Sequence, residues 1–103
     1  MKNPIFVALD LDDLDSALRL AKKCSGRVGG YKVGPRLLMK YGPRVVSELA
    51  SLAPVFVDNK YYDIPSTMLS SLRATFEAGA SFATIHAQAG AQALSEIARL
   101  EKE

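Results

Sequence analysis

The sequence is poor in cysteine, in tryptophan and in long apolar runs. Its 103 residues contain one cysteine, Cys24, and no tryptophan. A single cysteine excludes an intrachain disulfide, and no Cys/His spacing typical of zinc is present, so we expect a reducing, cytoplasmic setting. The first apolar run, residues 5–9, ends at Asp10. It is too short for a secretion signal or a membrane span.

Net charge is also small. Thirteen Lys and Arg stand against eleven Asp and Glu, for a formal charge of +2, and they form no basic block. Binding of nucleic acid through many contacts between basic side chains and phosphates is therefore disfavoured. The length and the 49% share of hydrophobic residues fit one small domain over residues 1–103 with a limited core.

Short apolar runs alternate four times with segments of helical period. The runs are rich in β-branched and aromatic residues, as in strands covered on both faces; they are residues 5–9, 28–33, 55–57 and 82–85. In the segments between them, apolar residues recur at three- and four-residue steps; these are residues 14–24, 35–52, 66–78 and 89–103. Asp12 or Asp13 is expected to cap the first helix, and Gly26 and Gly79 to follow the first and third.

This alternation predicts an α/β fold of four βα units, (βα)4, with parallel strands and right-handed crossovers. Such units build either an open doubly wound sheet or part of a (βα)8 barrel, and both gather chemistry at the carboxyl ends of the strands. Neither GxGxxG nor GxxxxGK[ST] follows the first run. We therefore favour half of a TIM-type barrel over a nucleotide-binding sheet.

Charged or polar residues stand where the expected strands end: Asp10, Lys32, Asp58 with Lys60, and His86. Asp58 and Lys60 are two apart, so they share one face of a strand, with Phe56 below them. On the inner face of a barrel, they and Lys32 form a partly desolvated array of ammonium and carboxylate groups. Such an array suits a lysine that delivers a proton to a carbanion.

The alternative is a surface ion pair between Asp58 and Lys60, with Asp63 or Ser66 capping the helix that Pro65 opens. Because four strand ends converge on one small area, we favour a catalytic site over a surface ion pair for Asp10, Lys32, Asp58 and Lys60.

Other polar and aromatic residues have simpler interpretations. We expect His86 to be hydrogen-bonded and partly buried. Two placements are open for Tyr61 and Tyr62, covering a site or packing beneath the third helix, and we favour packing. Cys24 is expected to be a small packed residue.

The run Asp58-x-Lys60-x-x-Asp63-Ile64-Pro65-x-Thr67 resembles the orotidine 5′-phosphate decarboxylase signature, Asp-x-Lys-x-x-Asp-Ile-Pro-x-Thr. Three further blocks resemble the family's first, second and fourth strands: Val7-Ala8-Leu9-Asp10, Tyr31-Lys32-Val33-Gly34 and Thr84-Ile85-His86-Ala87. The resemblance covers essentially the whole chain and only the N-terminal half of the family's barrel. The family's phosphate-gripping loop and arginine belong to the other half.

The resemblance implies a carbon-carbon lyase of de novo pyrimidine synthesis. It converts orotidine 5′-monophosphate to uridine 5′-monophosphate and carbon dioxide without a cofactor. Lys60 is implied to protonate pyrimidine carbon 6, and Asp58 to sit near the departing carboxylate. Lys32 is implied to hold the charged network and the ribose, and Asp10 to bind ribose hydroxyls.

The same resemblance implies a homodimer. Asp63, Ile64 and Thr67 match residues that reach into the other subunit's site in this family. The implied catalytic set is Lys60, Asp58, Asp63 and Lys32, and substrate binding adds Asp10, Ile64 and Thr67.

Two other functions stay open. Magnesium-dependent sugar-phosphate relatives usually carry alanine after the second aspartate and an acid in place of Lys32, so Ile64 and Lys32 favour the metal-free enzyme. A non-catalytic assembly module is the other. Four parallel strands cannot close a barrel. We therefore expect little activity from this chain alone, and association by pairing of two copies, by segment exchange, or with a missing partner half.

Overall fold

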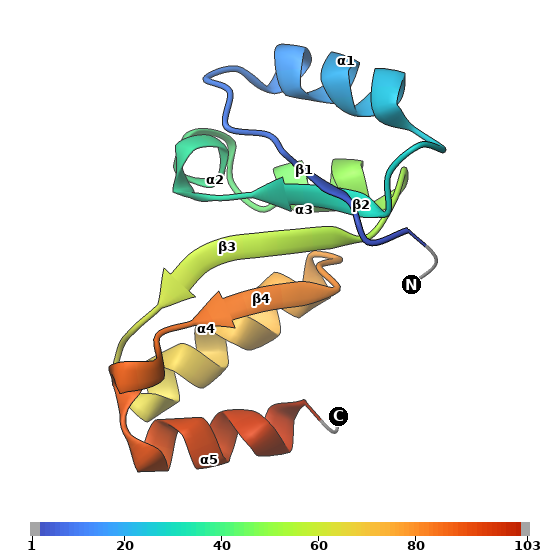
Figure 1. Ribbon diagram of the computed structural model, residues 1–103. Coiled ribbons are helices and arrows are strands. Elements are labelled where there is room, and N and C mark those ends of the chain that lie inside the picture. The colour runs from blue at the N-terminus through green and yellow to red at the C-terminus, as the bar shows by residue number, and fades with distance from the viewer. Residues whose placement is uncertain (1–2, 102–103) are drawn as a thin grey trace.

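The computed structural model describes residues 3–101, whose four strands form one parallel sheet in the order β1-β2-β3-β4. The strands are β1 (Phe6–Ala8), β2 (Gly30–Val33), β3 (Val55–Tyr61) and β4 (Phe82–Ile85). The helices are α1 (Leu14–Cys24), α2 (Pro35–Tyr41), α3 (Arg44–Ala50), α4 (Pro65–Glu77) and α5 (Ala91–Leu100), with a 3-10 turn η1 (Ala87–Ala89). In Figure 1, α3 and α4 lie behind the strands, α1 above and α5 below. The predicted (βα)4 architecture is confirmed.

The second and fourth helical segments differ from the prediction. The helix expected over residues 35–52 is divided into α2 and α3 at Gly42 and Pro43, because Gly42 has φ 76° and Pro43 has no N–H to continue the ladder. The helix expected over residues 89–103 begins at Ala91, after η1. Lys102 and Glu103 lie outside the described residues.

The strands also differ in length from the expected runs. β3 continues past Val57 to Tyr61, so the charged residues 58 and 60 belong to the strand itself. β1 and β2 are shorter than expected. Their ends are thus set by pairing with neighbours rather than by the length of the apolar run.

Helix ends match their predicted signals in two places. The Asp13 side chain accepts a hydrogen bond from the Ser16 N–H at 2.8 Å, which lowers the pKa of that carboxyl. Gly26 and Gly79 have φ of 82° and 119° just beyond α1 and α4. No helix within residues 3–101 has the length and apolar character needed to cross a membrane.

The core lies between the sheet and its helices. Its largest fully buried side chains come from both layers: Tyr31, Leu9, Leu37, Leu49, Met68, Val33, Val45, Val55 and Val57. The Tyr31 hydroxyl donates a hydrogen bond to the Ala21 carbonyl at 2.5 Å, tying β2 to α1, and burial raises the pKa of this phenol. Alternate residues of the same strands face the other side of the sheet, where Lys32 and Asp58 stand.

Tyr31→Phe is expected to lower the free energy of unfolding by about 1–2 kcal/mol, because the Ala21 carbonyl loses its hydroxyl donor in a buried place. Urea denaturation measures it. The control is Tyr41→Phe, since the Tyr41 hydroxyl makes no hydrogen bond with residues 3–101. Equal losses in both variants would show that the Tyr31 hydroxyl bond contributes nothing to stability.

Candidate active site

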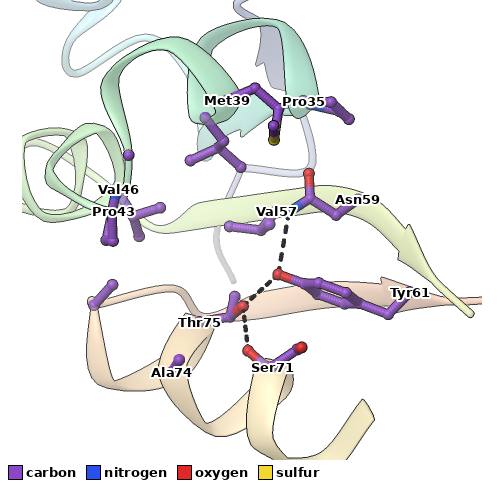
Figure 2. Close-up of a pocket in the computed structure, with 13 residues that line it drawn as sticks. Pro35, Met39, Pro43, Val46, Val57, Asn59, Tyr61, Ser71, Ala74 and Thr75 are labelled. Atoms are coloured by element: carbon purple, nitrogen blue, oxygen red, sulfur yellow. Dashed lines mark hydrogen bonds between the residues drawn. The ribbon is translucent and has the colours of Figure 1, made fainter. Parts of the chain in front are cut away.

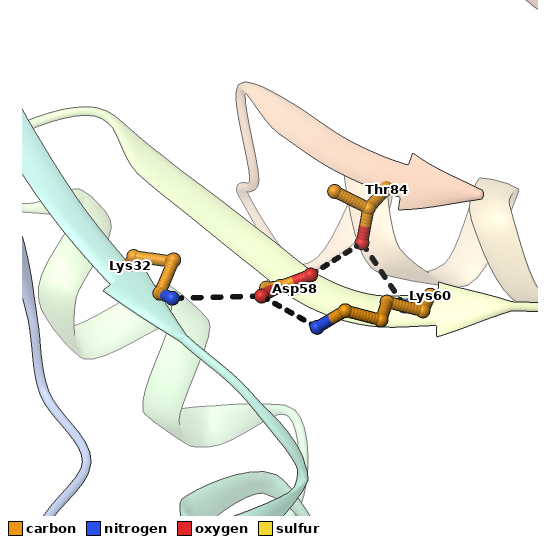
Figure 3. Close-up of polar contacts among 4 residues, drawn as sticks. All are labelled: Lys32, Asp58, Lys60 and Thr84. Carbon is orange, nitrogen blue, oxygen red and sulfur yellow. Dashed lines mark hydrogen bonds and ion pairs between the residues drawn. The ribbon is translucent and has the colours of Figure 1, made fainter. Parts of the chain in front are cut away.

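Three neighbouring strands bring their polar side chains together around the Asp58 carboxylate (Figure 3). Lys60 on the same strand places its Nζ 2.9 Å from Asp58 Oδ2, and Lys32 on β2 places its Nζ 3.5 Å from that oxygen. Thr84 on β4 donates its hydroxyl to Asp58 Oδ1 at 2.8 Å. The predicted grouping of Lys32, Asp58 and Lys60 is therefore confirmed as a geometric arrangement.

Exposure differs sharply within this cluster. The Asp58 side chain is 16% exposed, that of Lys32 36% and that of Lys60 70%. The expected partial desolvation of the whole array is thus wrong for Lys60, whose long side chain reaches the open rim of the sheet. The hydrogen bonds from Lys60 and Thr84 hold the pKa of the Asp58 carboxyl below its usual value. Asp58 is therefore an ionised acceptor at neutral pH.

Lys60 has an unusual backbone. Its φ is 49°, the one positive φ among non-glycine residues 3–101. The register between β3 and β4 shifts between Val57 and Tyr61, and the Lys60 N–H donates to Thr84 Oγ1 at 3.0 Å rather than to the β4 backbone. Such an irregularity turns a side chain away from its regular direction. It allows Lys60 to meet Asp58 while storing local strain.

The residues on either side of Lys60 are anchored on the opposite face of the sheet (Figure 2). Asn59 Nδ2 donates to the Tyr61 hydroxyl at 3.1 Å, and the Tyr61 hydroxyl donates to Thr75 Oγ1 at 2.5 Å, because the Thr75 hydroxyl hydrogen is already used in another bond. Thr75 in turn donates to the Ser71 carbonyl on α4 at 2.8 Å. This chain of bonds fixes the end of β3 to α4 and confirms the predicted packing of Tyr61.

The same network borders an outward-facing cavity of about 430 Å³. Its walls come from α2, α3, β3 and α4, and are mostly apolar. Asn59 Oδ1 is buried there without a hydrogen-bond partner among residues 3–101. This cavity lies on the helix-covered side of the sheet, so it is separate from the Asp58 cluster.

Asp10 does not join the Asp58 cluster. It is exposed after β1, and within residues 3–101 its side chain makes neither a hydrogen bond nor an ion pair with Lys32, Asp58 or Lys60. Its backbone carbonyl accepts from Arg36 Nη1 at 2.9 Å. The expected binding of ribose hydroxyls by Asp10 therefore stays a prediction.

The residues after β3 form the start of α4. Asp63 accepts from the Ile64 N–H at 2.7 Å, and Ile64 is the helix N-cap without a side-chain hydrogen bond. The alternative prediction that Asp63 or Ser66 caps this helix is therefore wrong, because Asp63 bonds to its own neighbour and Ser66 already lies inside the helix. Asp63, Ile64 and Thr67 are all exposed, Ile64 at 63%.

His86 behaves as predicted, and Tyr62 does not. His86 is half-buried, its N–H donates to the Tyr61 carbonyl at 2.8 Å, and its Nδ1 accepts from the Gln88 N–H at 3.1 Å. Tyr62 is 58% exposed and stacks on the His86 ring with centroids 4.5 Å apart. Its predicted position beneath the third helix is wrong, since only Tyr61 turns toward α4. Cys24 is half-buried against the core, as expected.

Thr84 is the cluster member that the sequence prediction missed. It stands two residues after Phe82, so the two-residue period of a strand places it on the same face as that ring and opposite Asp58. That spacing is visible in the sequence.

Residues 3–101 contain no group of three or more His, Cys, Asp or Glu side chains placed to hold a metal ion.

The sequence is similar to known proteins along its whole length. The model of the Orotidine 5′-phosphate decarboxylase / HUMPS family matches residues 3–103. The chain is 40% identical over 100 residues to orotidine 5′-phosphate decarboxylase of Novosphingobium aromaticivorans, covering 96% of this chain and 44% of the relative. Identity to that of Paramagnetospirillum magneticum is 38% over 92 residues, covering 88% and 39%.

Solved structures agree. Orotidine 5′-phosphate decarboxylase from Pyrococcus horikoshii OT3 is similar with a TM-score of 0.86 and 25% identity, covering 93% of this chain and 48% of that one. The enzyme from Methanocaldococcus jannaschii, complexed with the inhibitor BMP, is similar with a TM-score of 0.88 and 26% identity, covering 97% and 47%. The chain spans about half the length of the relatives it matches.

The strained backbone of Lys60 yields a stability prediction. Glycine tolerates positive φ, so Lys60→Gly is expected to be more stable than Lys60→Ala by about 1 kcal/mol. Urea denaturation of the two variants measures the difference.

The control is the same pair of substitutions at Lys32, where φ is negative. There the order reverses, with alanine more stable than glycine by about 0.5–1 kcal/mol. Alanine more stable than glycine at both positions would contradict the strained conformation.

Proposed function

Because the chain belongs to the Orotidine 5′-phosphate decarboxylase / HUMPS family, we propose that it carries the proton-donating part of an orotidine 5′-monophosphate decarboxylase site. The observation that carries the proposal is the cluster in which Lys60, Lys32 and Thr84 converge on the Asp58 carboxylate. It lies where parallel strands end, which is where barrel enzymes gather their reacting groups.

In this proposal, the bond between pyrimidine carbon 6 and the substrate carboxylate breaks, and carbon dioxide leaves. The electron pair of the broken bond stays on carbon 6. The Lys60 ammonium transfers a proton to that carbon, forming the C–H bond of uridine 5′-monophosphate, and regains a proton from water. A donor held in place by a neighbouring acceptor is the usual requirement of general acid catalysis, and Lys60 Nζ lies 2.9 Å from Asp58 Oδ2.

Asp58 has two roles in the proposal. As an ionised acceptor it orients the Lys60 ammonium, and Thr84 fixes its other oxygen at 2.8 Å. It also lies beside the substrate carboxylate, so the two negative charges repel each other until carbon dioxide departs, which raises the ground state relative to the transition state. Lys32 supplies a second cation, so the cluster of two lysines and one aspartate carries a formal charge of +1 and accepts an anionic substrate.

The exposed residues around the cluster are proposed to bind the rest of the substrate and a second subunit. Asp10, at the end of β1, binds ribose hydroxyls. Asp63, Ile64 and Thr67 reach a neighbouring subunit's site; their exposure at the start of α4 supports this assignment.

We propose that the reaction needs no metal. Lys32 places an ammonium 3.5 Å from Asp58, in the position where the sugar-phosphate relatives carry the acid of their magnesium site. A cation beside Asp58 competes with a metal ion for the same oxygens. Activity that EDTA abolishes and magnesium restores would favour the sugar-phosphate branch instead.

The test is the decrease in orotidine 5′-monophosphate absorbance with the purified chain, together with binding of BMP followed by NMR. Turnover is expected to be slow, because binding energy from remote parts of a substrate is used at the reacting centre and the chain spans about half of its relatives. Lys60→Ala is expected to lower turnover by at least about 100-fold.

The control for this assay is Lys23→Ala, which removes an exposed lysine of α1 and leaves turnover unchanged. Equal turnover in Lys60→Ala and the parent chain refutes the role of Lys60. A chain that neither decarboxylates the substrate nor binds BMP refutes the proposed function and favours a non-catalytic module.

A further inference from the structure

Thr84 makes two hydrogen bonds that join Lys60 to Asp58 (Figure 3). The Lys60 N–H donates to Thr84 Oγ1 at 3.0 Å, and the Thr84 hydroxyl donates to Asp58 Oδ1 at 2.8 Å. The directions of both bonds are fixed, because a backbone N–H can only donate and an ionised carboxylate can only accept. One hydroxyl therefore accepts from the backbone of the lysine and donates to the carboxylate that pairs with its ammonium.

These two bonds close a ring around Lys60. The other oxygen of the carboxylate, Asp58 Oδ2, lies 2.9 Å from Lys60 Nζ. Lys60 is thus held at its backbone N–H by Thr84 and at its ammonium by Asp58, and these two partners are bonded to each other. A change at the Thr84 hydroxyl therefore affects both ends of the lysine.

The pairing of β3 with β4 explains why a hydroxyl is useful at this point. The register shifts between Val57 and Tyr61, so that residues 58–60 of β3 lie opposite a single residue of β4, Thr84. Such an irregularity interrupts the ladder of backbone hydrogen bonds, and the acceptor that the Lys60 N–H finds on β4 is a side chain. Valine or isoleucine, which also favour strands, would supply neither the acceptor nor the donor.

The same bond helps to define the backbone of Lys60. Its φ of 49° is a left-handed conformation that costs a non-glycine residue about 1–2 kcal/mol and persists where the surroundings impose it. The Thr84 oxygen receives the N–H of the residue in this conformation. Threonine suits this position, because a β-branched side chain has few χ1 rotamers and holds its hydroxyl in one direction.

A purely structural role is the alternative for Thr84. In that case the hydroxyl only satisfies a buried backbone donor at an irregular place in the sheet, where an unsatisfied donor costs about 1–3 kcal/mol. That role does not require the second bond, to Asp58. The hydrogen bonds from Lys60 and Thr84 both lower the pKa of the Asp58 carboxyl, so the hydroxyl acts on the charged group as well as on the backbone.

We propose that Thr84 is the positioning residue of the proton donor: its two bonds set the backbone of Lys60 and the orientation of the carboxylate that holds the Lys60 ammonium. Thr84 acts through Lys60 and Asp58 and transfers no proton itself. The placement of Lys60 follows from contacts within residues 3–101, whereas its effect on turnover rests on the proposed function.

Thr84→Val tests this role, because valine keeps the shape of the side chain and removes both bonds, while Thr84→Ser keeps the hydroxyl. NMR of the labelled chain gives two readouts that need no substrate. In Thr84→Val, exchange of the Lys60 amide is expected to be about 10-fold faster, as for the loss of one hydrogen bond. The Asp58 carboxyl carbon is expected to titrate at a higher pH than in the unchanged chain. Thr84→Ser is expected to stay close to the unchanged chain in both readouts.

The matched control is Thr75→Val. The Thr75 hydroxyl also makes two hydrogen bonds in a partly buried place, but on the helix side of the sheet. This variant is expected to lose stability in urea denaturation without a shift in the Asp58 titration. It separates a loss of stability from a loss of positioning.

Decarboxylation of orotidine 5′-monophosphate gives the third readout. Thr84→Val is expected to lower kcat by about 10- to 100-fold with little change in KM, and Thr84→Ser to restore most of it. A kcat that Thr84→Val leaves unchanged in an active chain overturns the proposal. If the unchanged chain shows no turnover while both NMR readouts shift, the positioning of Lys60 stands and the proposed function fails.

The NMR readouts decide the proposal whether or not the chain is active. A Lys60 amide exchange and an Asp58 titration that Thr84→Val leaves unchanged overturn it. In the unchanged chain, the Lys60 amide is expected to be protected from exchange by Thr84. An unprotected Lys60 amide there overturns the proposal even if Thr84→Val does not fold.

Discussion

The Asp58 carboxylate is the contact on which the charged edge of this sheet depends. It lies on β3 and receives Lys60 from its own strand, Lys32 from β2 and the Thr84 hydroxyl from β4. Without this acceptor, the ammonium groups of Lys32 and Lys60 would lie on the same face of the sheet with no opposite charge between them, which is unfavourable. One side chain thus sets the positions of the groups from three strands.

The opposite face of β3 supports this arrangement. Tyr61 is held to Thr75 on α4, and Asn59 is held to the Tyr61 hydroxyl, so the residue between them is fixed on both sides. Lys60 takes up the change of direction with a φ of 49°. Strain at a functional position persists when the surroundings over-determine it, and here the buried hydroxyl network on one side and the ionic cluster on the other do so.

The features that follow from the periodicity of the sequence were predicted correctly. Those that depend on contacts between distant residues were not. The four βα units, the bounds of α1 and the grouping of Lys32, Asp58 and Lys60 follow from alternation and spacing. The break at Gly42 and Pro43 was visible in the sequence but was outweighed by the helical period around it.

Other features depend on tertiary contacts. Thr84 has only its two-residue spacing from Phe82 as a signal in the sequence, and because it is uncharged its contact with Asp58 is seen only when β3 and β4 are paired. The extension of β3 to Tyr61 and the positive φ of Lys60 depend on the partner strand and the helix behind it. The high exposure of Lys60 follows from the open rim, which spacing along one strand does not describe.

The most direct test of the central claim is the NMR titration of the Asp58 side-chain carboxyl carbon between pH 2 and 7 in the labelled chain. A carboxylate stabilised by Lys60 and Thr84 is predicted to titrate below its ordinary value of 3.8, so its stabilising contribution is present above that pH and is lost as the pH falls through the lowered pKa. A midpoint at or above 3.8 would contradict the account.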